Sequence, residues 1–388
     1  MKNKFLGATL MVAGSAIGAG MLGLPIATSF CGFYPSLLAM SITWFFLLLT
    51  SFILVDVNLE IPGESNLVSM AENRLGLMGK VIIWIAYLFL LYALDVAFLA
   101  GGSTIIKNRI AILDKLSPLI ILLPIAITIF YGMKKIDLIN RLMMIGKLGI
   151  GYLILIIFAP SHVQIANLAR MDFSSLFFSL PIVLEAFGFH TIIPSLIYYL
   201  NRDGKMAKGA MALGSFLALL IYAFWQFIVL GTVPLTTLVT TFTEGKAATI
   251  PLIAIIHRPI ISLGADIFAI CAIGTAFLGV SLGLFDFLAD GLRIKKTLKG
   301  RFSLSLLTFT PLLLFVYICP KIFITALKYA GFLACIVFGL MPICMAFTMS
   351  NTSFWKCKKG KVILIIATLF FIMVITSIFI TKTANTSR

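Results

Sequence analysis

Gly14-Ser15-Ala16-Ile17-Gly18-Ala19-Gly20 lies in the middle of the first long apolar run of the chain, which extends from Phe5 to Thr28. Such a run is long enough for a membrane-spanning helix, which needs about 20 residues. Each glycine costs roughly 1 kcal/mol of helix propensity relative to alanine, so three glycines in this short stretch weaken the helix at mid-depth. In lipid, a freed amide or carbonyl must find an internal partner or line a polar cavity. We therefore predict a break in this helix that forms a binding site.

The composition of the chain excludes a soluble protein. The 388 residues are 61% hydrophobic and 11% charged, with a mean hydropathy of +1.11, whereas a soluble domain is about 45–50% apolar and about 25% charged. The net charge of +16 comes from short basic clusters between apolar runs rather than from one amphipathic face. Such clusters indicate membrane topology. We therefore expect an integral membrane protein whose surroundings are the lipid bilayer, with no nucleic acid partner.

The cysteines give no sign of metal or redox chemistry. The six cysteines form no CxxC or CxxH pair, and most lie inside apolar runs, where cysteine behaves as a small buried hydrophobe. No HExxH or GxxxxGK[ST] motif is present, so nothing indicates a membrane protease or an ATP-driven pump. We expect no enzyme activity, no metal and no cofactor.

Apolar segments of spanning length predict an all-α membrane protein with eleven transmembrane helices. The first segment is longer than the apolar core of a signal peptide, about 7–15 residues, so we interpret it as a span. The predicted spans are 5–28, 33–55, 80–103, 116–132, 142–160, 176–200, 209–232, 259–289, 302–319, 322–347 and 361–381.

The basic residues predict which end of each span faces the cytoplasm. With eleven spans, the larger share of the 30 Lys and Arg residues falls on the side of the N-terminus, including the clusters 293–301 and 356–361. This bias favours a cytoplasmic N-terminus and a C-terminus outside a bacterial inner membrane. Two loops are long: 56–79 is interpreted as a cytoplasmic connection with some helix, and 231–259 as an outer cap.

A second interruption lies in the sixth span, at Phe187-Gly188-Phe189-His190-Thr191-Ile192-Ile193-Pro194. It follows the first by five spans. Paired interrupted helices in two halves are the sequence sign of an inverted-repeat transporter, with substrate held between the breaks. The alternative is that glycine and proline only kink these helices, which is common in membranes. Two interruptions at this offset favour the transporter.

Helix ends predict the chemistry of such a site. The amides that open the outer half of the first span, around Gly20, would face a carboxylate. Carbonyl groups freed around Ala16 and at Phe187 to Gly188 would accept from an ammonium group. An amino acid carries both charges. Phe187 and Phe189 beside the break suit an aromatic side chain, although ordinary packing is the alternative for both.

Ionisable residues inside the spans are the next candidates, because a charge at the centre of a membrane helix costs at least about 2.5–3.5 kcal/mol. Asp95 and Tyr92 are separated by three residues and share a helix face near mid-depth. Glu185 lies just before the second break and His190 lies within it. A buried carboxyl group can carry a proton, so these residues are candidates for proton coupling. The alternative is a static hydrogen-bonded role.

Lys147 has two interpretations. It lies about 8 Å inside the fifth span at 1.5 Å per residue, so its side chain could reach the inner surface. Alternatively, it points inward and its ammonium group occupies a position that a sodium ion would otherwise fill.

Several motifs together resemble the hydroxy and aromatic amino acid permeases, and within that family the tyrosine-specific transport proteins. The resemblance covers nearly the whole chain. The motifs that carry it are Ala13 to Leu22 with Pro25, Tyr92-Ala93-Leu94, Asn140-Arg141, Phe187-Gly188-Phe189-His190 with Pro194-Ser195, Phe277 to Asp290, and Lys328-Tyr329-Ala330-Gly331.

This resemblance implies the leucine-transporter-like 5+5 inverted repeat with broken helices 1 and 6, in the amino acid–polyamine–organocation superfamily. The repeats would occupy 5–160 and 176–347, followed by an eleventh helix at 361–381. It also implies uptake of an aromatic amino acid, tyrosine first and tryptophan or phenylalanine next, driven by a proton gradient. Lys147 looks like the fifth-helix lysine of related proton-coupled transporters.

The predicted site is therefore a set of residues at the two breaks and near them. The expected substrate-binding residues are Ser15, Ala16, Gly18, Gly20, Tyr92, Phe187, Gly188, Phe189 and His190. The expected coupling residues are Lys147, Asp95 and Glu185.

Asp95 and Glu185 depart from the family pattern, where uncharged residues are expected. Two acids could accommodate a different amino acid or an extra cation. A sodium-coupled or broader-specificity amino acid carrier is the alternative within transport, and a channel or a membrane-embedded enzyme is the alternative outside it. The sequence predicts a small-molecule substrate, an amino acid, as the binding partner and no obligate protein partner.

Overall fold

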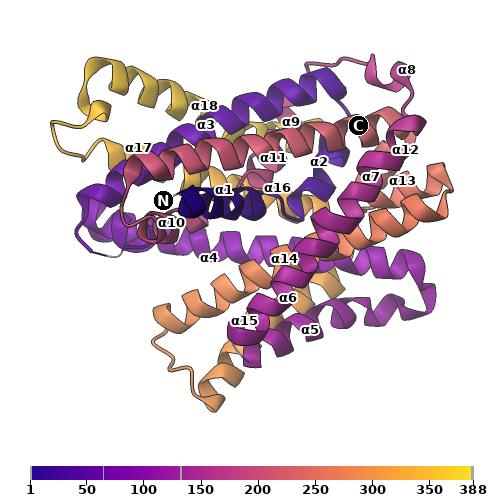
Figure 1. Ribbon diagram of the computed structural model, residues 1–388, viewed down its shortest axis with the longest axis horizontal. Coiled ribbons are helices and arrows are strands. Elements are labelled where there is room, and N and C mark those ends of the chain that lie inside the picture. Colours follow the sequence, from indigo (N-terminus) through magenta and orange to yellow (C-terminus); the bar gives the residue numbers. More distant parts are fainter. Residues whose placement is uncertain (1, 64, 132, 386–388) are drawn as a thin grey trace.

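The structure is a computed structural model that describes residues 2–385 except 64 and 132, and the long helices lie side by side in one bundle (Figure 1). Within those residues every regular element is a helix. The α-helices are α1 (Lys2–Ala16), α2 (Gly20–Thr28), α3 (Phe33–Glu60), α4 (Leu67–Arg109), α5 (Ser117–Tyr131), α6 (Met133–Met144), α7 (Leu153–Phe158), α8 (Ile165–Leu168), α9 (Leu176–Ala186), α10 (Ile193–Tyr199), α11 (Gly204–Thr232), α12 (Leu235–Thr243), α13 (Thr249–Ile256), α14 (Pro259–Gly291), α15 (Leu298–Ile318), α16 (Phe323–Ala334), α17 (Met341–Ala346) and α18 (Lys358–Asn385). The other helical segments are the 3₁₀-helices η1 (Ala111–Leu116), η3 (Pro160–His162), η4 (His190–Ile192) and η6 (Phe354–Lys356) and the π-helices η2 (Ile145–Tyr152) and η5 (Cys335–Leu340).

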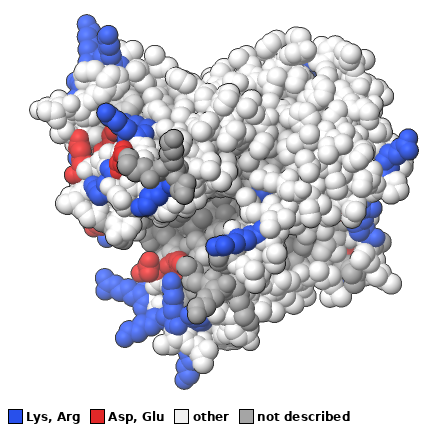
Figure 2. Space-filling view, in the orientation of Figure 1, with Lys and Arg blue, Asp and Glu red and all other residues white. Residues whose placement is uncertain are grey.

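The number of membrane spans agrees with the prediction. Among the described residues, ten helical stretches are long and apolar enough to cross a membrane, and the bent pair α1 and α2 makes an eleventh. Figure 2 shows most charged side chains of the visible face at the end of the molecule where α1 begins, and a wide uncharged surface over the middle. The orientation of the termini across the membrane stays a prediction.

The third span begins earlier than predicted. It runs from Leu67 to Arg109 rather than over 80–103. Asn66 caps its start, because its side chain accepts from the Ser69 amide at 2.8 Å while the Ser69 hydroxyl accepts from the Asn66 amide. The helix kinks at Gly76, whose φ of 69° is one that glycine adopts without strain. The part of α4 before this kink is the helix that was expected within the 56–79 connection.

The loop 231–259 folds into two short helices, α12 and α13, at the end of the bundle opposite the start of α1 (Figure 1). The amide of Ala248 donates to the carbonyl of Leu22 on α2, at 3.0 Å. The predicted cap is thus attached to α2, the second half of the first broken helix.

The first span breaks where its glycines predict. α1 ends at Ala16 and α2 begins at Gly20, with an angle of 54° between the two helices. Within the break, the amide of Gly18 donates to the carbonyl of Ala16 at 2.8 Å instead of a carbonyl four residues back. A Cβ at Gly20 would lie 3.1 Å from the Cα of Ala186 on α9, so only glycine permits this close approach of the two broken helices.

The sixth span also breaks at the predicted place. α9 ends at Ala186, and the chain then leaves the α-helix until α10 begins at Ile193, next to Pro194. The amide of Gly188 turns back to the carbonyl of Glu185, at 2.9 Å. α2 packs on α9 and α1 packs on α10, so the two broken helices lie side by side.

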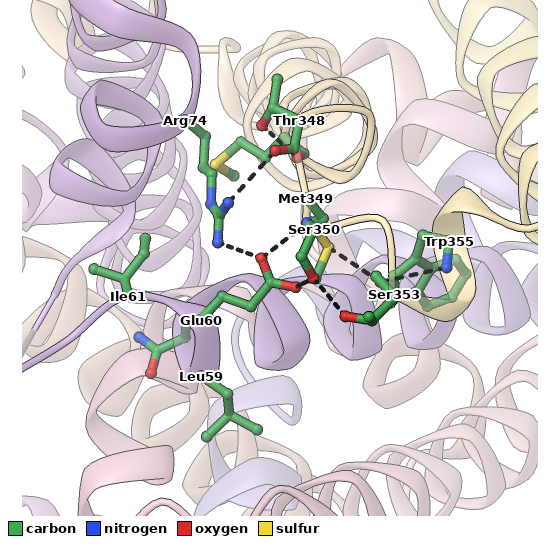
Figure 3. Close-up of polar contacts among 12 residues, drawn as sticks. Leu59, Glu60, Ile61, Arg74, Thr348, Met349, Ser350, Ser353 and Trp355 are labelled. Atoms are coloured by element: carbon green, nitrogen blue, oxygen red, sulfur yellow. Dashed lines mark hydrogen bonds and ion pairs between the residues drawn. The ribbon is translucent and has the colours of Figure 1, made fainter.

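A polar network joins three parts of the chain at the end where α1 begins (Figure 3). Glu60, the last residue of α3, pairs with Arg74 of α4 at 2.7 Å. Its other oxygen accepts from the Ser350 hydroxyl at 2.8 Å, in the segment that follows α17. This network holds together α3, α4 and the segment that follows α17.

Candidate functional site

A cavity of about 670 Å³ lies between the two breaks. Its walls come from α1 and the first turn of α2, from α4, from the end of α6, from the end of α9 and the broken segment that follows it, from α14, and from α16 with η5. Small-molecule sites usually measure about 300–1,000 Å³. The cavity is therefore large enough for an amino acid with an aromatic side chain.

The cavity extends from the breaks toward the end of the bundle where α1 begins. Gly7 and Leu10, near the start of α1, line it. A second cavity of about 650 Å³ shares Tyr87 and Thr191 with it and reaches Arg202 and the α3–α4 connection. The two cavities are therefore adjacent, and the second lies beside the α3–α4 connection.

The structure places five of the nine predicted binding residues at the cavity wall. These are Ser15, Ala16, Gly18, Gly20 and Gly188. Tyr92, Phe187, Phe189 and His190 are not part of that wall among the described residues. Of the predicted coupling residues, Glu185 lines the cavity, whereas Asp95 and Lys147 lie behind it.

Phe187, Phe189 and His190 point away from the cavity into the helix packing. Phe187 packs edge-to-face on Tyr222, with ring centroids 5.0 Å apart. The His190 ring stacks on Phe338, and its Nε2 lies 3.0 Å from the hydroxyl of Thr50. The expectation that the two phenylalanines form the aromatic wall is therefore not what the geometry shows. Non-helical backbone connects these residues, and sequence spacing does not determine side-chain direction there.

Other apolar side chains form the wall that faces the breaks. On α4 they are Leu90, Leu91, Leu94 and Phe98, and on η5 the wall residue is Phe338. Phe98 and Phe338, together with Tyr87 of α4, are the aromatic rings that line the cavity.

Tyr92 and Asp95 face different neighbours. The Tyr92 hydroxyl donates to the carbonyl of Leu307 on α15 at 2.9 Å, so it turns away from the cavity. Asp95 is fully buried beside Ser281 of α14, yet neither carboxyl oxygen has a hydrogen-bond partner of acceptable geometry among the described residues. Ser281 is the centre of a Gly279-to-Gly283 stretch that fits GxSxG, but this stretch lies inside the continuous helix α14 rather than on a strand-to-helix turn.

Lys147 points inward. Of its two interpretations, the geometry therefore favours the inward-facing ammonium group over a side chain that reaches the inner surface. Its side chain is completely buried in the π-helix η2. The ammonium nitrogen donates to the carbonyl of Ile17 at 2.6 Å and to the hydroxyl of Thr275 on α14 at 3.2 Å. Lys147 therefore does not reach the inner surface. Its charge is fixed at the carbonyl end of α1, where the helix dipole favours a cation.

Tyr222 of α11 connects the two breaks, and the sequence analysis missed it. Its hydroxyl contacts the carbonyl oxygens of Ala16 and Ala186, the last residues of α1 and α9. One turn further, Trp225 donates to the carbonyl of Met21 at 2.9 Å, and Gln226 donates to the hydroxyl of Thr28 at 2.8 Å. One face of α11 thus supports the broken first span along its outer half.

These contacts also change the expected ammonium site. The carbonyl of Ala16 accepts from Gly18 and from Tyr222, and the carbonyl of Ile17 accepts from Lys147. A carbonyl oxygen has two lone pairs and the Tyr222 hydroxyl has one hydrogen, so the Ala16 oxygen is fully engaged only when Tyr222 donates to it rather than to Ala186. The carbonyl groups at the first break that were predicted to receive a substrate ammonium are therefore largely occupied by the protein itself.

Comparison with known proteins identifies the family. The sequence pattern of the tryptophan/tyrosine permease family matches residues 1–378. The chain belongs to this family. This result confirms the resemblance inferred from the motifs at the two breaks, and relatives in the family are named as transport proteins rather than enzymes.

The relatives of this permease include proteins named for both aromatic substrates. It is 32% identical to the tryptophan-specific transport protein of Haemophilus influenzae, over 88% of this chain and 86% of that protein. It is 30% identical to the tyrosine-specific transport system 1 of the same organism, over 92% of this chain and 89% of that protein. The relatives therefore do not separate tyrosine from tryptophan.

Solved structures share the fold of this permease at low sequence identity. A manganese transporter of Eremococcus coleocola, crystallised with an aromatic bis-isothiourea compound, is 14% identical with a TM-score of 0.65, over 96% of this chain and 86% of that one. A mutant of the same transporter is 12% identical with a TM-score of 0.64, over 97% of this chain and 85% of that one. These are transporters of the leucine-transporter-like fold, which confirms the predicted fold class.

In the described part of the permease, no three His, Cys, Asp or Glu side chains come together as a metal site requires.

Proposed function

We propose that this permease imports an aromatic amino acid across the bacterial cytoplasmic membrane by proton symport. The substrates named for its relatives support an aromatic amino acid, with tyrosine as the first candidate and tryptophan and phenylalanine next. The proposal keeps the N-terminus in the cytoplasm and the C-terminus outside, because the basic clusters lie on the side of the N-terminus. It invokes no cofactor and no protein partner.

In this proposal the substrate lies between the two breaks. Its carboxylate binds at the first turn of α2, where Gly20 lines the cavity and unpaired amides favour an anion. Its side chain packs on Phe98 and Phe338. The hydroxyl groups of Ser15 and Thr191, which line the same cavity, are available to its ammonium group.

The observation that carries the proton-coupled assignment is the contact between Lys147 and Ile17. A buried ammonium group at 2.6 Å from the carbonyl of the first break supplies the positive charge there. The protein therefore needs no sodium ion at this position, because the fixed charge of Lys147 takes its place. Sodium coupling is the alternative, and the test must distinguish it from proton coupling.

The test is uptake of radiolabelled tyrosine into proteoliposomes that contain the purified full chain. An inward proton gradient should drive accumulation, and tryptophan and phenylalanine should compete more strongly than serine. Accumulation that needs a sodium gradient instead would establish a sodium-coupled carrier. Preloaded unlabelled tyrosine should accelerate uptake by exchange, which a channel does not do. If tyrosine and tryptophan both fail to accumulate under either gradient, the proposed function is wrong.

A further inference from the structure

Glu185 is a carboxyl group inside the cavity with no partner of its own. It is 8% exposed, lines the cavity wall, and its Oε2 has no hydrogen-bond partner among the described residues. This same oxygen lies 2.6 Å from the position that a Cβ at Gly20 would occupy. The carboxyl group of α9 therefore rests directly on the first residue of α2.

The first turn of α2 is a site for an anion. α2 is nine residues long, and no described backbone hydrogen bond begins at the amide of Ala19 or of Gly20. The amides that open a helix and its dipole attract negative charge over about one turn. Glu185 occupies the approach to this turn, so a substrate carboxylate that binds there comes into contact with the carboxyl group of Glu185.

No fixed positive charge compensates Glu185 from the helices packed on α9, as far as the structure describes them. The facing titratable group is the phenol of Tyr222 on α11. α2 carries no titratable residue, and Lys328 of α16 donates to the carbonyl of Ile378 on α18. On α3, Asp56 pairs with Lys208 and Glu60 pairs with Arg74.

The remaining basic residues near this region have other contacts or lie far along their helices. Lys147 is bound to Ile17 and Thr275, and the lysines Lys358, Lys359 and Lys361 lie at the start of α18. An ionised Glu185 would thus repel a second carboxylate at the same turn, because like charges that share a site disfavour ionisation of both. A protonated Glu185 would instead donate a hydrogen bond to it, and hydrogen bonds to a charged acceptor are short and strong.

We propose that Glu185 is the proton site that links proton binding to substrate binding: its carboxyl group must be protonated for the substrate carboxylate to bind at the first turn of α2. The inference rests on the proposed function, because it assumes an amino acid substrate. It adds the residue and the step at which proton and substrate meet. Each amino acid that binds is then accompanied by one proton on Glu185. The proton and the amino acid are released together.

The first measurement is equilibrium binding of radiolabelled tyrosine or tryptophan to the purified full chain from about pH 5 to about pH 9. In the wild type, affinity should fall by up to about tenfold per pH unit on the alkaline side, because one proton is bound with each substrate. Glu185→Gln, which mimics the protonated side chain, should still bind the amino acid with an affinity that no longer depends on pH. Glu72→Gln, which removes a half-exposed carboxylate paired with Lys80 outside the cavity, should keep the wild-type profile.

Amines that lack the carboxylate provide a control that needs no variant. Tyramine and tryptamine compete for the same cavity in the wild type but carry no group that opposes Glu185, so alkaline pH should not weaken their competition. If their profile falls on the alkaline side as the amino acid profile does, the inference is wrong.

The number of protons taken up when the substrate binds tests the role of Glu185 independently. In a weakly buffered solution with a pH indicator, wild-type protein should take up protons as tyrosine binds, and should take up none as tyramine binds. Two results would overturn the inference: a Glu185→Gln protein that keeps the alkaline loss of affinity, or one that no longer binds the amino acid, since the latter means that ionised Glu185 holds the substrate ammonium. Wild-type protein that binds no aromatic amino acid at any pH removes the proposed function itself. Binding without proton uptake removes only the role of Glu185.

Discussion

The ammonium nitrogen of Lys147 lies 2.6 Å from the carbonyl oxygen of Ile17, so a buried cation of the fifth span is fixed at the break of the first. A buried acceptor that loses its donor costs about 1–3 kcal/mol, and 1.4 kcal/mol is about a factor of ten in an equilibrium. Lys147→Ala should therefore reduce proton-driven accumulation of tyrosine by about tenfold or more. Lys80→Ala, which removes an exposed lysine, should not. Accumulation that survives Lys147→Ala with its proton dependence intact would remove the coupling role of this lysine.

The Tyr222 hydroxyl contacts the carbonyl ends of both α1 and α9, so it links the two halves of the site. A phenol has one hydrogen and can donate to only one of these oxygens at a time. Tyr222→Phe should lower the affinity for tyrosine by several-fold and lower the thermal midpoint, because the loss leaves buried carbonyl oxygens without this donor. Equilibrium binding and thermal unfolding in detergent measure the two effects.

Tyr152→Phe is the matched control for this change. The Tyr152 hydroxyl donates to the carbonyl of Ile221 at 2.6 Å, on α11 but outside the cavity wall. It should lower the thermal midpoint to a similar extent and leave the affinity unchanged. If both variants change affinity equally, the effect of Tyr222 is general to helix packing rather than specific to the breaks.

The sequence predicted both breaks because glycine and proline act locally on the helix in which they occur. Gly18 and Gly20 weaken a helix wherever its neighbours lie, and the same holds for Gly188 and Pro194. Glu185 was also found, because a carboxyl group in an apolar run is rare whatever its surroundings. These signals need no knowledge of how the spans pack.

The rest of the site depends on how the spans pack on one another, and the sequence pattern of a single span does not show this. Tyr92 and Leu91 are adjacent on α4, and only the rotation of the helix in the bundle decides which one meets the cavity. Tyr222 carried no exceptional signal as a single hydroxyl in an apolar run. Its spacing from Trp225 and Gln226 places all three on one helix face, and that polar stripe is the pattern that could have found it.

The network of Glu60, Arg74 and Ser350 should contribute more to stability than an exposed ion pair does (Figure 3). The Arg74 side chain is 13% exposed and that of Glu60 is 26% exposed, so solvent screens their interaction only in part. Arg74→Ala should cost about 1–2 kcal/mol, since hydrogen bonds to charged groups contribute about 1.5–3 kcal/mol and solvent screens this partly exposed pair to some extent. Lys80→Ala breaks a pair that is 41% and 47% exposed and should cost about 0–1 kcal/mol. Equal losses in thermal unfolding would contradict this ranking.

Gly20→Ala tests the close approach of the two broken helices. The added Cβ would lie 2.6 Å from Oε2 of Glu185, which can move, and 3.1 Å from the Cα of Ala186, which is backbone. The first turn of α2 must then shift from α9, and affinity for tyrosine should fall by about tenfold, which corresponds to about 1.4 kcal/mol. In Gly149→Ala the added Cβ meets only a methyl group of Ile145 at 3.7 Å, so binding should stay as in the wild type. Unchanged affinity in Gly20→Ala would place the carboxylate elsewhere.

Gly279 of α14 offers a way to separate tryptophan from tyrosine. It lines the cavity, and no atom lies within 4 Å of a Cβ added there, so a larger side chain extends into open space rather than into the protein. The series Gly279→Ala, Gly279→Val and Gly279→Leu should reduce the cavity in steps without a clash at the first atom. Because one methylene group in an apolar pocket changes binding by about 1–3 kcal/mol, affinity for the larger indole should fall by about tenfold before affinity for the phenol ring changes. Competition by tryptophan, tyrosine and phenylalanine against one radiolabelled ligand measures the order, and a Leu variant that binds all three as the wild type does would show that the substrate does not reach this wall.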